Sequence, residues 1–213
     1  MIPAERVYEQ LKANMPERIW WPADSKWEII AGAILVQNTN WRNVERSLDN
    51  LWEATAFEPE KIVEYPLEKI QELVRPSGFY TNKGKTIKAI FLWLQQFSFC
   101  LATIKERYDK ASLRKQLLSI RGIGDETADV LLVYIFEEVE FIADRYAQRL
   151  FERLGVQKIK GYSDLKSRVS LPPDFSSEEA QAFHVLILDF GKEFLKNDAA
   201  WEASFLSDFT LEA

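Results

Sequence analysis

The sequence is poor in the side chains that most often bind metals or act as nucleophiles. Its 213 residues include one cysteine, Cys100, and one histidine, His184. A single cysteine cannot form an internal disulfide or hold a metal cluster, so we expect Cys100 to pack in the core. One histidine likewise excludes a histidine-based metal site, and it leaves no basis for a triad of serine, histidine and aspartate.

Long hydrophobic runs are also missing. No apolar stretch reaches the roughly 18–20 residues needed to span a bilayer, and residues 1–14 alternate charged and apolar side chains instead of forming a signal-peptide core. We therefore expect no membrane partner and a cytoplasmic location. Hydrophobic residues make up 47% of the chain and include seven Trp and fourteen Phe, which excludes disorder. The length suffices for one large domain or two small ones.

Positive charge is scarce overall, because the net charge is −6, but it is unevenly distributed. Residues 75–88 carry four basic and no acidic side chains, and residues 105–121 carry six basic and two acidic ones. Residues 174–213 carry nine acidic and two basic side chains. This pattern predicts a basic face suited to a polyanion such as DNA. The alternative is a set of ordinary solvated helix faces.

Apolar residues recur at helical spacing along nearly the whole chain, and strand-like alternation is scarce. Start signals such as Asn40, Pro59, Pro66, Asp125 and Ser176 support an all-α fold. The predicted helices span 3–14, 27–37, 41–55, 59–64, 66–74, 81–97, 100–108, 111–119, 125–137, 144–154, 163–170, 176–196 and 198–209.

The most informative segment joins two of these helices through Gly122-Ile123-Gly124-Asp125. Two glycines around one apolar residue allow a tight turn, since positive φ is available and no Cβ intervenes. We expect Ile123 to point inward. The backbone N–H groups at the start of the second helix would then be accessible to a phosphate group.

The wider pattern L-x-x-I-x-G-I-G-x-x-T-A-D-x-x-L-x-Y, followed by A-D-R-Y-A-x-R, resembles the helix-hairpin-helix DNA glycosylases of the endonuclease III superfamily. The resemblance implies a two-lobed fold, with a six-helix barrel over residues 27–138. Residues 1–26 and 139–213 would form the second domain, with the catalytic aspartate at the cleft. It also implies a monomer, associated with the nucleoid, that binds damaged double-stranded DNA.

In that family the hairpin grips the DNA backbone, which points to Arg121, Gly122, Ile123 and Gly124, and a later aspartate is the catalytic carboxylate. Asp144 occupies the aspartate of A-D-R-Y-A-x-R. A carboxylate near the sugar would stabilise the positive charge that develops as the base departs. Asp144 as the N-cap of the following helix is the structural alternative, and one residue can serve both purposes.

Two further segments resemble parts of the family that probe the duplex. Gln37, in L-V-Q-N-T-N, matches the glutamine that fills the gap left by the displaced base; its alternative is an amide that caps a helix end. Phe79, in R-P-S-G-F-Y-T-N-K-G-K, matches an apolar wedge beside the lesion, and its alternative is a packed loop aromatic. Lys83 and Lys85 would then contact phosphates.

The tryptophans suggest the substrate. Trp20, Trp21 and Trp41 match aromatic positions that line the pocket in the 3-methyladenine glycosylase branch, and Lys192 matches a lysine near that pocket. An electron-rich aromatic wall suits a positively charged alkylated purine. Ordinary core aromatics are the alternative.

These features predict a monofunctional DNA glycosylase of base excision repair that removes alkylated purines. Relatives with lyase activity carry a lysine where this chain has Glu126, and glutamate cannot form a Schiff base. No cofactor is expected, since the iron–sulfur cluster of many relatives needs four cysteines; a monovalent cation at the hairpin is compatible with the resemblance. The alternatives are a mismatch uracil/thymine glycosylase and a non-catalytic DNA-binding protein.

Overall fold

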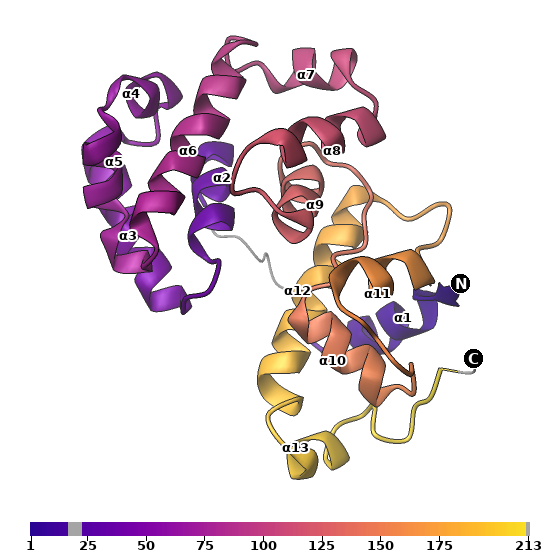
Figure 1. The fold of residues 1–213 in the computed structure, drawn as a ribbon. Helices are drawn as coiled ribbons and strands as arrows, with labels where there is room; N and C mark the ends of the chain where they lie inside the picture. Colours follow the sequence, from indigo (N-terminus) through magenta and orange to yellow (C-terminus); the bar gives the residue numbers. More distant parts are fainter. Residues whose placement is uncertain (17–22, 212–213) are drawn as a thin grey trace. The chain divides into compact units, whose positions relative to one another are not determined.

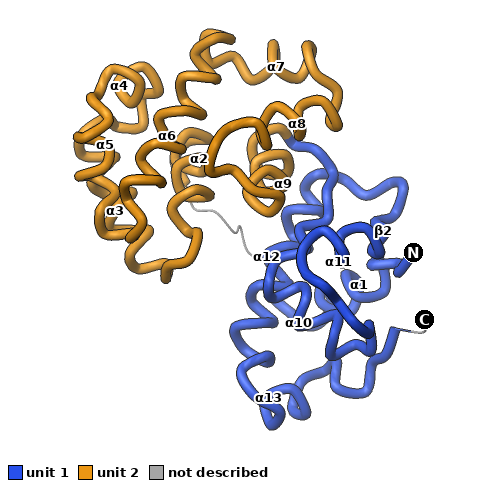
Figure 2. The backbone as a smooth tube through the Cα atoms, in the orientation of Figure 1, with its two compact units in different colours: residues 1–20, 137–213 blue, residues 21–136 orange. Residues whose placement is uncertain are grey.

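A computed structural model describes residues 1–16 and 23–211, and the regular structure within these ranges is almost entirely helical (Figure 1). The all-α fold class is therefore confirmed. The chain divides into two compact units, one of residues 21–136 and the other of residues 1–20 and 137–213 (Figure 2). None of the helices in the described ranges is long and apolar enough to cross a membrane.

The unit of residues 21–136 is organised around α6 (Tyr80–Gln95), which packs against α2, α4 and α5 (Figure 1). The buried face of α6 carries Ile87, Ile90, Phe91 and Leu94, the spacing of an amphipathic helix. Helix α9 packs against α2 and α8. The other elements are α2 (Lys26–Leu35), α3 (Trp41–Thr55), α4 (Pro59–Glu64), α5 (Leu67–Leu73), the 3-10 helix η1 (Arg75–Ser77), α7 (Leu101–Arg107), α8 (Lys110–Ser119) and α9 (Asp125–Tyr134).

Side-chain caps fix where several of these helices begin. The Asn40 side chain accepts a hydrogen bond from the backbone N–H of Asn43, as its place before α3 predicts. Ser25 caps α2 and Asp109 caps α8 in the same way. In this unit both ends of α3 and of α4 coincide with the prediction, and the other predicted helix ends lie within three residues of the observed ones.

The unit of residues 1–20 and 137–213 packs around α12 (Ser177–Phe194), which contacts α1 (Glu5–Asn14), α10 (Arg145–Arg153) and α13 (Asp198–Glu202). Helix α12 begins with a capping box, in which Ser176 and Glu179 exchange side-chain and backbone hydrogen bonds. The Phe183 ring lies edge-on to Tyr8 of α1, at 5.5 Å between centroids. Aromatic packing therefore joins the first helix of the unit to its longest one. The remaining helix is α11 (Tyr162–Arg168).

Two details of this unit differ from the sequence prediction. A short parallel pairing joins β1 (Ile2–Pro3) to β2 (Val169–Ser170), where helices were predicted at both places. Helix α13 ends at Glu202 instead of 209. The backbone after it forms turns in which an N–H bonds to the carbonyl three residues earlier, such as Ser207 N–H to Ser204 C=O. Two-residue strands and single turns are too short to leave a periodic pattern in the sequence.

Candidate functional site

The predicted hairpin is a tight turn between α8 and α9, and Gly122 is the residue that makes it possible. Gly122 has φ of +96°, and a Cβ placed there would lie 2.0 Å from Oγ1 of Thr86. That hydroxyl is buried on α6 and donates to the backbone carbonyls of Arg121 and Asn82. Ile123 is buried, as expected. The turn is therefore in direct contact with α6.

Gly124 has a different role from the one its sequence position suggested. Its φ of −96° and ψ of −179° are open to any residue, and nothing lies within 4 Å of where its Cβ would be. As the N-cap of α9, Gly124 offers no side chain to the first turn. Across residues 1–16 and 23–211, no acceptor is hydrogen-bonded to the N–H of Gly122 or Gly124. Both glycines are exposed, so the hairpin carries two backbone donors of the kind that bind phosphate.

An arginine from the first helix of the hairpin holds the second in place. Nε of Arg114 lies 2.7 Å from Oδ1 of Asp129, and one of its terminal nitrogens lies 2.7 Å from Oδ1 of Asp125. The Asp129 side chain is fully buried. Hydrogen bonding to Asp129, and less strongly to Asp125, raises the pKa of the Arg114 guanidinium. Arg114 therefore links the two helices of the hairpin through ion pairs and is not part of an exposed basic face.

Gln37 reaches the hairpin from the loop after α2. Its Nε2 donates to Oγ1 of Thr127 at 3.0 Å and to the carbonyl of Gly122 at 3.4 Å. The alternative of a helix-end cap does not describe these contacts. The structure therefore brings Gln37 and the hairpin together in one local cluster.

Phe79 is strongly exposed, at 67%, although it is a large apolar residue. It precedes α6 with φ of +47°, a conformation that non-glycine residues seldom adopt. The alternative of a packed loop aromatic is wrong. The ring is therefore accessible to a ligand.

The two lysines after Phe79 have different environments. Lys83 is only 5% exposed, and its Nζ donates to the carbonyls of Ser77 at 2.6 Å and Leu35 at 2.8 Å. Burial lowers the pKa of Lys83 to about 8. The expectation that Lys83 contacts phosphate is therefore corrected, because its ammonium is already engaged inside the protein. Lys85 is exposed, as a phosphate contact needs.

Lys88 is also turned inward, since its Nζ donates to the carbonyls of Val63 and Tyr65 at the C-terminal end of α4. Burial lowers the pKa of Lys88. Of the four basic residues in 75–88, Arg75 and Lys85 are thus exposed. The basic face predicted from charge counts is smaller than expected, because charge counts do not distinguish exposed from buried lysines.

In the other unit, Asp144 is a buried carboxylate, 6% exposed, at the N-cap of α10. Its Oδ1 accepts a hydrogen bond of 2.7 Å from the backbone N–H of Ala147. Its Oδ2 lies 3.9 Å from Nε2 of His184 on α12. Burial, aided by the positive charge of Lys192, lowers the pKa of His184 to about 3, so the imidazole is neutral near pH 7. The N-cap alternative describes this geometry, and it leaves a catalytic role open.

The helix that carries Asp144 is seated closely on α12. A Cβ at Gly191 would lie 2.2 Å from the Tyr146 ring, so only glycine lets that ring lie against α12. His184 and Gly191 are seven residues apart and share one face of α12. The sequence reasoning missed His184 as a neighbour of Asp144, because their approach depends on how α10 packs against α12 and leaves no local signal in the sequence.

The residues expected to line the base pocket are only partly described. Trp20 and Trp21 lie outside the described residues. Trp41 opens α3 and is 37% exposed. Lys192 is exposed on α12, with Nζ 3.8 Å from Oδ1 of Asp189. Glu126 is exposed in the first turn of α9. The structure therefore places Trp41 and Lys192 at the surface.

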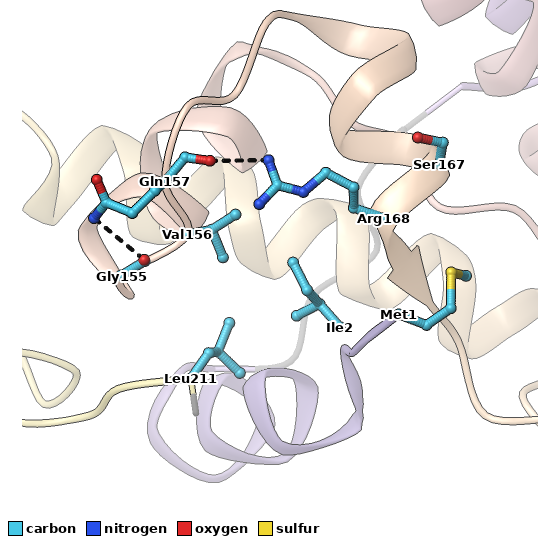
Figure 3. Close-up of a pocket in the computed structure, with 8 residues that line it drawn as sticks. All are labelled: Met1, Ile2, Gly155, Val156, Gln157, Ser167, Arg168 and Leu211. Carbon is cyan, nitrogen blue, oxygen red and sulfur yellow. Dashed lines mark hydrogen bonds between the residues drawn. The ribbon is translucent and has the colours of Figure 1, made fainter. Parts of the chain in front are cut away.

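A cavity of about 440 Å³ lies elsewhere in the unit of residues 1–20 and 137–213 (Figure 3). The Arg168 guanidinium donates to the carbonyl of Gln157 at 3.0 Å and lies 3.5 Å from the Asp164 carboxylate. Among the described residues, none of those predicted for the site lines this cavity. Its lining consists of Met1, Ile2, Gly155, Val156, Gln157, Ser167, Arg168 and Leu211.

Among residues 1–16 and 23–211, no group of three or more histidine, cysteine, aspartate or glutamate side chains is arranged to hold a metal ion. Cys100 is exposed, which corrects the expectation of core packing. It directly precedes α7 and follows a turn at Ser98 and Phe99 with positive φ, so its side chain faces out.

Comparisons with known proteins show the family to which the chain belongs. The model of the "HhH-GPD superfamily base excision DNA repair protein" family matches residues 31–171. A Methanocaldococcus jannaschii protein, provisionally named a DNA repair glycosylase, is 36% identical over 210 residues, covering 97% of this chain and 94% of the relative. Endonuclease III of Sulfolobus acidocaldarius is 28% identical over 170 residues, covering 79% of this chain and 73% of that protein.

A solved structure is similar over nearly the whole chain. It is the 3-methyladenine DNA glycosylase of H. pylori bound to 1,N6-ethenoadenine, with a TM-score of 0.73 and 28% identity. The match covers 92% of this chain and all of that one. The family match spans more than half of the chain, and the archaeal relative is similar along almost its full length. The chain therefore belongs to the HhH-GPD superfamily of base excision DNA repair proteins.

Proposed function

We propose that the chain is a monofunctional DNA glycosylase that hydrolyses the N-glycosidic bond of alkylated purines, such as N3-methyladenine, in double-stranded DNA. The observation that carries the proposal is the buried Asp144 carboxylate, held at an N-cap in a chain of this repair family. The hairpin supports DNA as the partner, because Gly122 and Gly124 are exposed and their N–H groups have no acceptor within the described ranges.

In this reaction Asp144 acts on the sugar as the base departs. Positive charge develops on the sugar, and a fixed carboxylate stabilises it and orients a water molecule for attack. The Ala147 N–H holds one carboxylate oxygen in place before substrate arrives. His184 is neutral near pH 7, so it does not cancel the negative charge that the reaction uses.

The surface of the other unit supplies the contacts with the duplex. The N–H groups of Gly122 and Gly124 bind a phosphate, and the exposed Lys85 binds another. Phe79 enters beside the displaced nucleotide, where its exposure suits an apolar wedge. Gln37 occupies the gap left by the base.

No lyase step and no cofactor are part of this proposal. Glu126 stands where lyase-competent relatives carry the lysine that forms a Schiff base, and a carboxylate cannot do so. A four-cysteine cluster does not fit this chain, which has a single, exposed cysteine.

Borohydride reduction tests the absence of the lyase step. We expect no covalent protein–DNA adduct when the enzyme, damaged duplex and borohydride are mixed. The hairpin has Glu126 where lyase-competent relatives have the lysine that forms the adduct. A bifunctional endonuclease III serves as the positive control. An adduct with this chain would show a Schiff base and would overturn the monofunctional assignment.

The choice of base follows from the chemistry of the leaving group. N3-methyladenine is already cationic, so a single carboxylate and aromatic stacking suffice without strong acid catalysis. Trp41 offers an exposed aromatic surface, and the related H. pylori enzyme is a 3-methyladenine glycosylase.

A set of matched duplexes tests this preference. Under single-turnover conditions, we expect release of N3-methyladenine to be faster than release of uracil or 8-oxoguanine, since neutral bases are poorer leaving groups. Free base is scored by chromatography. Faster release of uracil or 8-oxoguanine would contradict the alkylated-purine assignment while leaving the glycosylase assignment intact.

A further inference from the structure

The ammonium of Lys83 joins two loops that are far apart in sequence. The Gln37 loop, residues 36–40, follows the end of α2 at Leu35, and the Phe79 loop, residues 78–79, follows the end of η1 at Ser77. Nζ of Lys83 donates to the carbonyls of both Leu35 and Ser77. The backbone N–H of Lys83 also donates to the carbonyl of Phe79. One residue therefore contacts the start of one loop and both sides of the other.

Burying the charged Lys83 side chain costs solvation free energy, which its hydrogen bonds must offset. A buried ammonium loses hydration, and burial is the cause of the lowered pKa of Lys83. No carboxylate is among its hydrogen-bond partners within the described ranges; both acceptors are backbone carbonyls at helix ends. Such carbonyls lack partners within their own helix and favour a cation. α2 has no basic residue in its last turn, so Lys83 supplies that charge from α6.

Neighbouring contacts connect the same loops to the hairpin. Gln37 donates to Gly122 and Thr127, and Thr86, three residues after Lys83 on α6, donates to the carbonyl of Arg121. The Ser77 N–H donates to Oγ of Ser47 on α3, which fixes η1 on its other side. The segments that carry Gln37 and Phe79 are therefore attached to one framework, and the Lys83 side chain donates to the residue that directly precedes each loop.

We propose that Lys83 is a positioning residue that holds the Gln37 loop and the Phe79 loop in one fixed geometry, so that both engage the same opened position in DNA. This inference rests on the proposed function, because it concerns how the glycosylase recognises an opened duplex. Lys83 does not touch DNA itself. Its contribution is to discrimination between opened and intact duplex, and phosphate affinity comes from other residues.

The test compares Lys83→Met with Lys85→Met, which removes the same charge from an exposed position two residues away. The probes are a duplex with a tetrahydrofuran abasic site and the same duplex without it. For Lys83→Met we expect the affinity ratio between the two to fall by about tenfold or more, because small displacements of positioned groups are costly. Affinity for the intact duplex should stay nearly unchanged.

Lys85→Met should give the opposite pattern. Both affinities fall together, the ratio stays at the wild-type value, and the slope of log affinity against log salt decreases by about 0.9 for the lost phosphate contact. A Lys83→Met protein that keeps the wild-type ratio overturns the proposal. A wild-type protein that does not distinguish the two duplexes contradicts the proposed function instead.

Chemical rescue separates positioning from folding. Lys83→Cys in a Cys100→Ser background is alkylated in denaturant with bromoethylamine, which restores an ammonium, or with bromopropane, which gives an apolar side chain of the same length. After refolding, we expect only the aminoethyl form to regain discrimination, while both forms show wild-type circular dichroism. If the propyl form fails to refold, the ammonium serves overall stability and the positioning proposal is overturned.

Discussion

Replacing Asp144 with asparagine is expected to reduce base release by about 10³-fold or more, which corresponds to roughly 4 kcal/mol in the activation barrier. Asparagine is neutral and cannot stabilise a cationic sugar. Single-turnover release of N3-methyladenine from a defined duplex is the measurement. Release within tenfold of the wild-type rate would reject Asp144 as the catalytic carboxylate.

This substitution removes the negative charge of Asp144 and keeps its helix-capping hydrogen bond. Asparagine caps helices about as well as aspartate, and its side-chain oxygen can still accept from the Ala147 N–H. The folded state and the affinity for DNA should therefore be unchanged. Asp144→Ala is the matched control, because it removes the cap as well and should lower stability by about 1 kcal/mol. A loss of activity that followed stability across the two variants would point to a structural role only.

Gly122→Ala should be the most damaging single-methyl change in the hairpin. Alanine at φ of +96° is strained, and its Cβ would lie 2.0 Å from Oγ1 of Thr86. Rotating that hydroxyl away would break its hydrogen bond to Arg121. Together these effects should cost about 2–5 kcal/mol in the free energy of unfolding. Urea-induced unfolding followed by circular dichroism measures the loss.

Two controls distinguish the causes of this loss. Adding Thr86→Ala should recover most of the part due to the clash, since only the 3.1 Å approach to Cβ of residue 86 remains, but it should not recover the part due to φ. Gly124→Ala should change stability by less than about 1 kcal/mol, since the methyl group meets open space at an ordinary φ. That same methyl group should weaken duplex binding by about tenfold, if a phosphate approaches there. Equal stability losses at the two glycines would contradict the hairpin geometry.

The parts of the molecule that the sequence predicted well are those with local signals. The Gly122–Gly124 turn, the inward side chain of Ile123, and the Asn40 and Ser176 caps are each determined by neighbouring residues in the chain. Helical periodicity likewise extends over whole elements. Such features follow from backbone geometry and capping, which need no knowledge of distant contacts.

The errors arose where distant segments decide the outcome. Lys83 was predicted at the surface, but it is drawn inward by two carbonyls, one of them 48 residues away in sequence. Arg114 and Lys88 were counted in a basic face, although both are committed to internal acceptors. The approach of His184 to Asp144 depends on how α10 and α12 pack. Charge counts and motifs carry no information about these pairings.

The most direct test of the central claim is release of free base from genomic DNA that has been methylated and incubated with the wild-type protein. Chromatography of the ethanol-soluble fraction separates the bases. A DNA glycosylase predicts free N3-methyladenine in excess of a no-enzyme control, with the DNA strands left intact apart from abasic sites. Absence of any free base, with the protein folded and bound to DNA, would contradict the enzyme assignment.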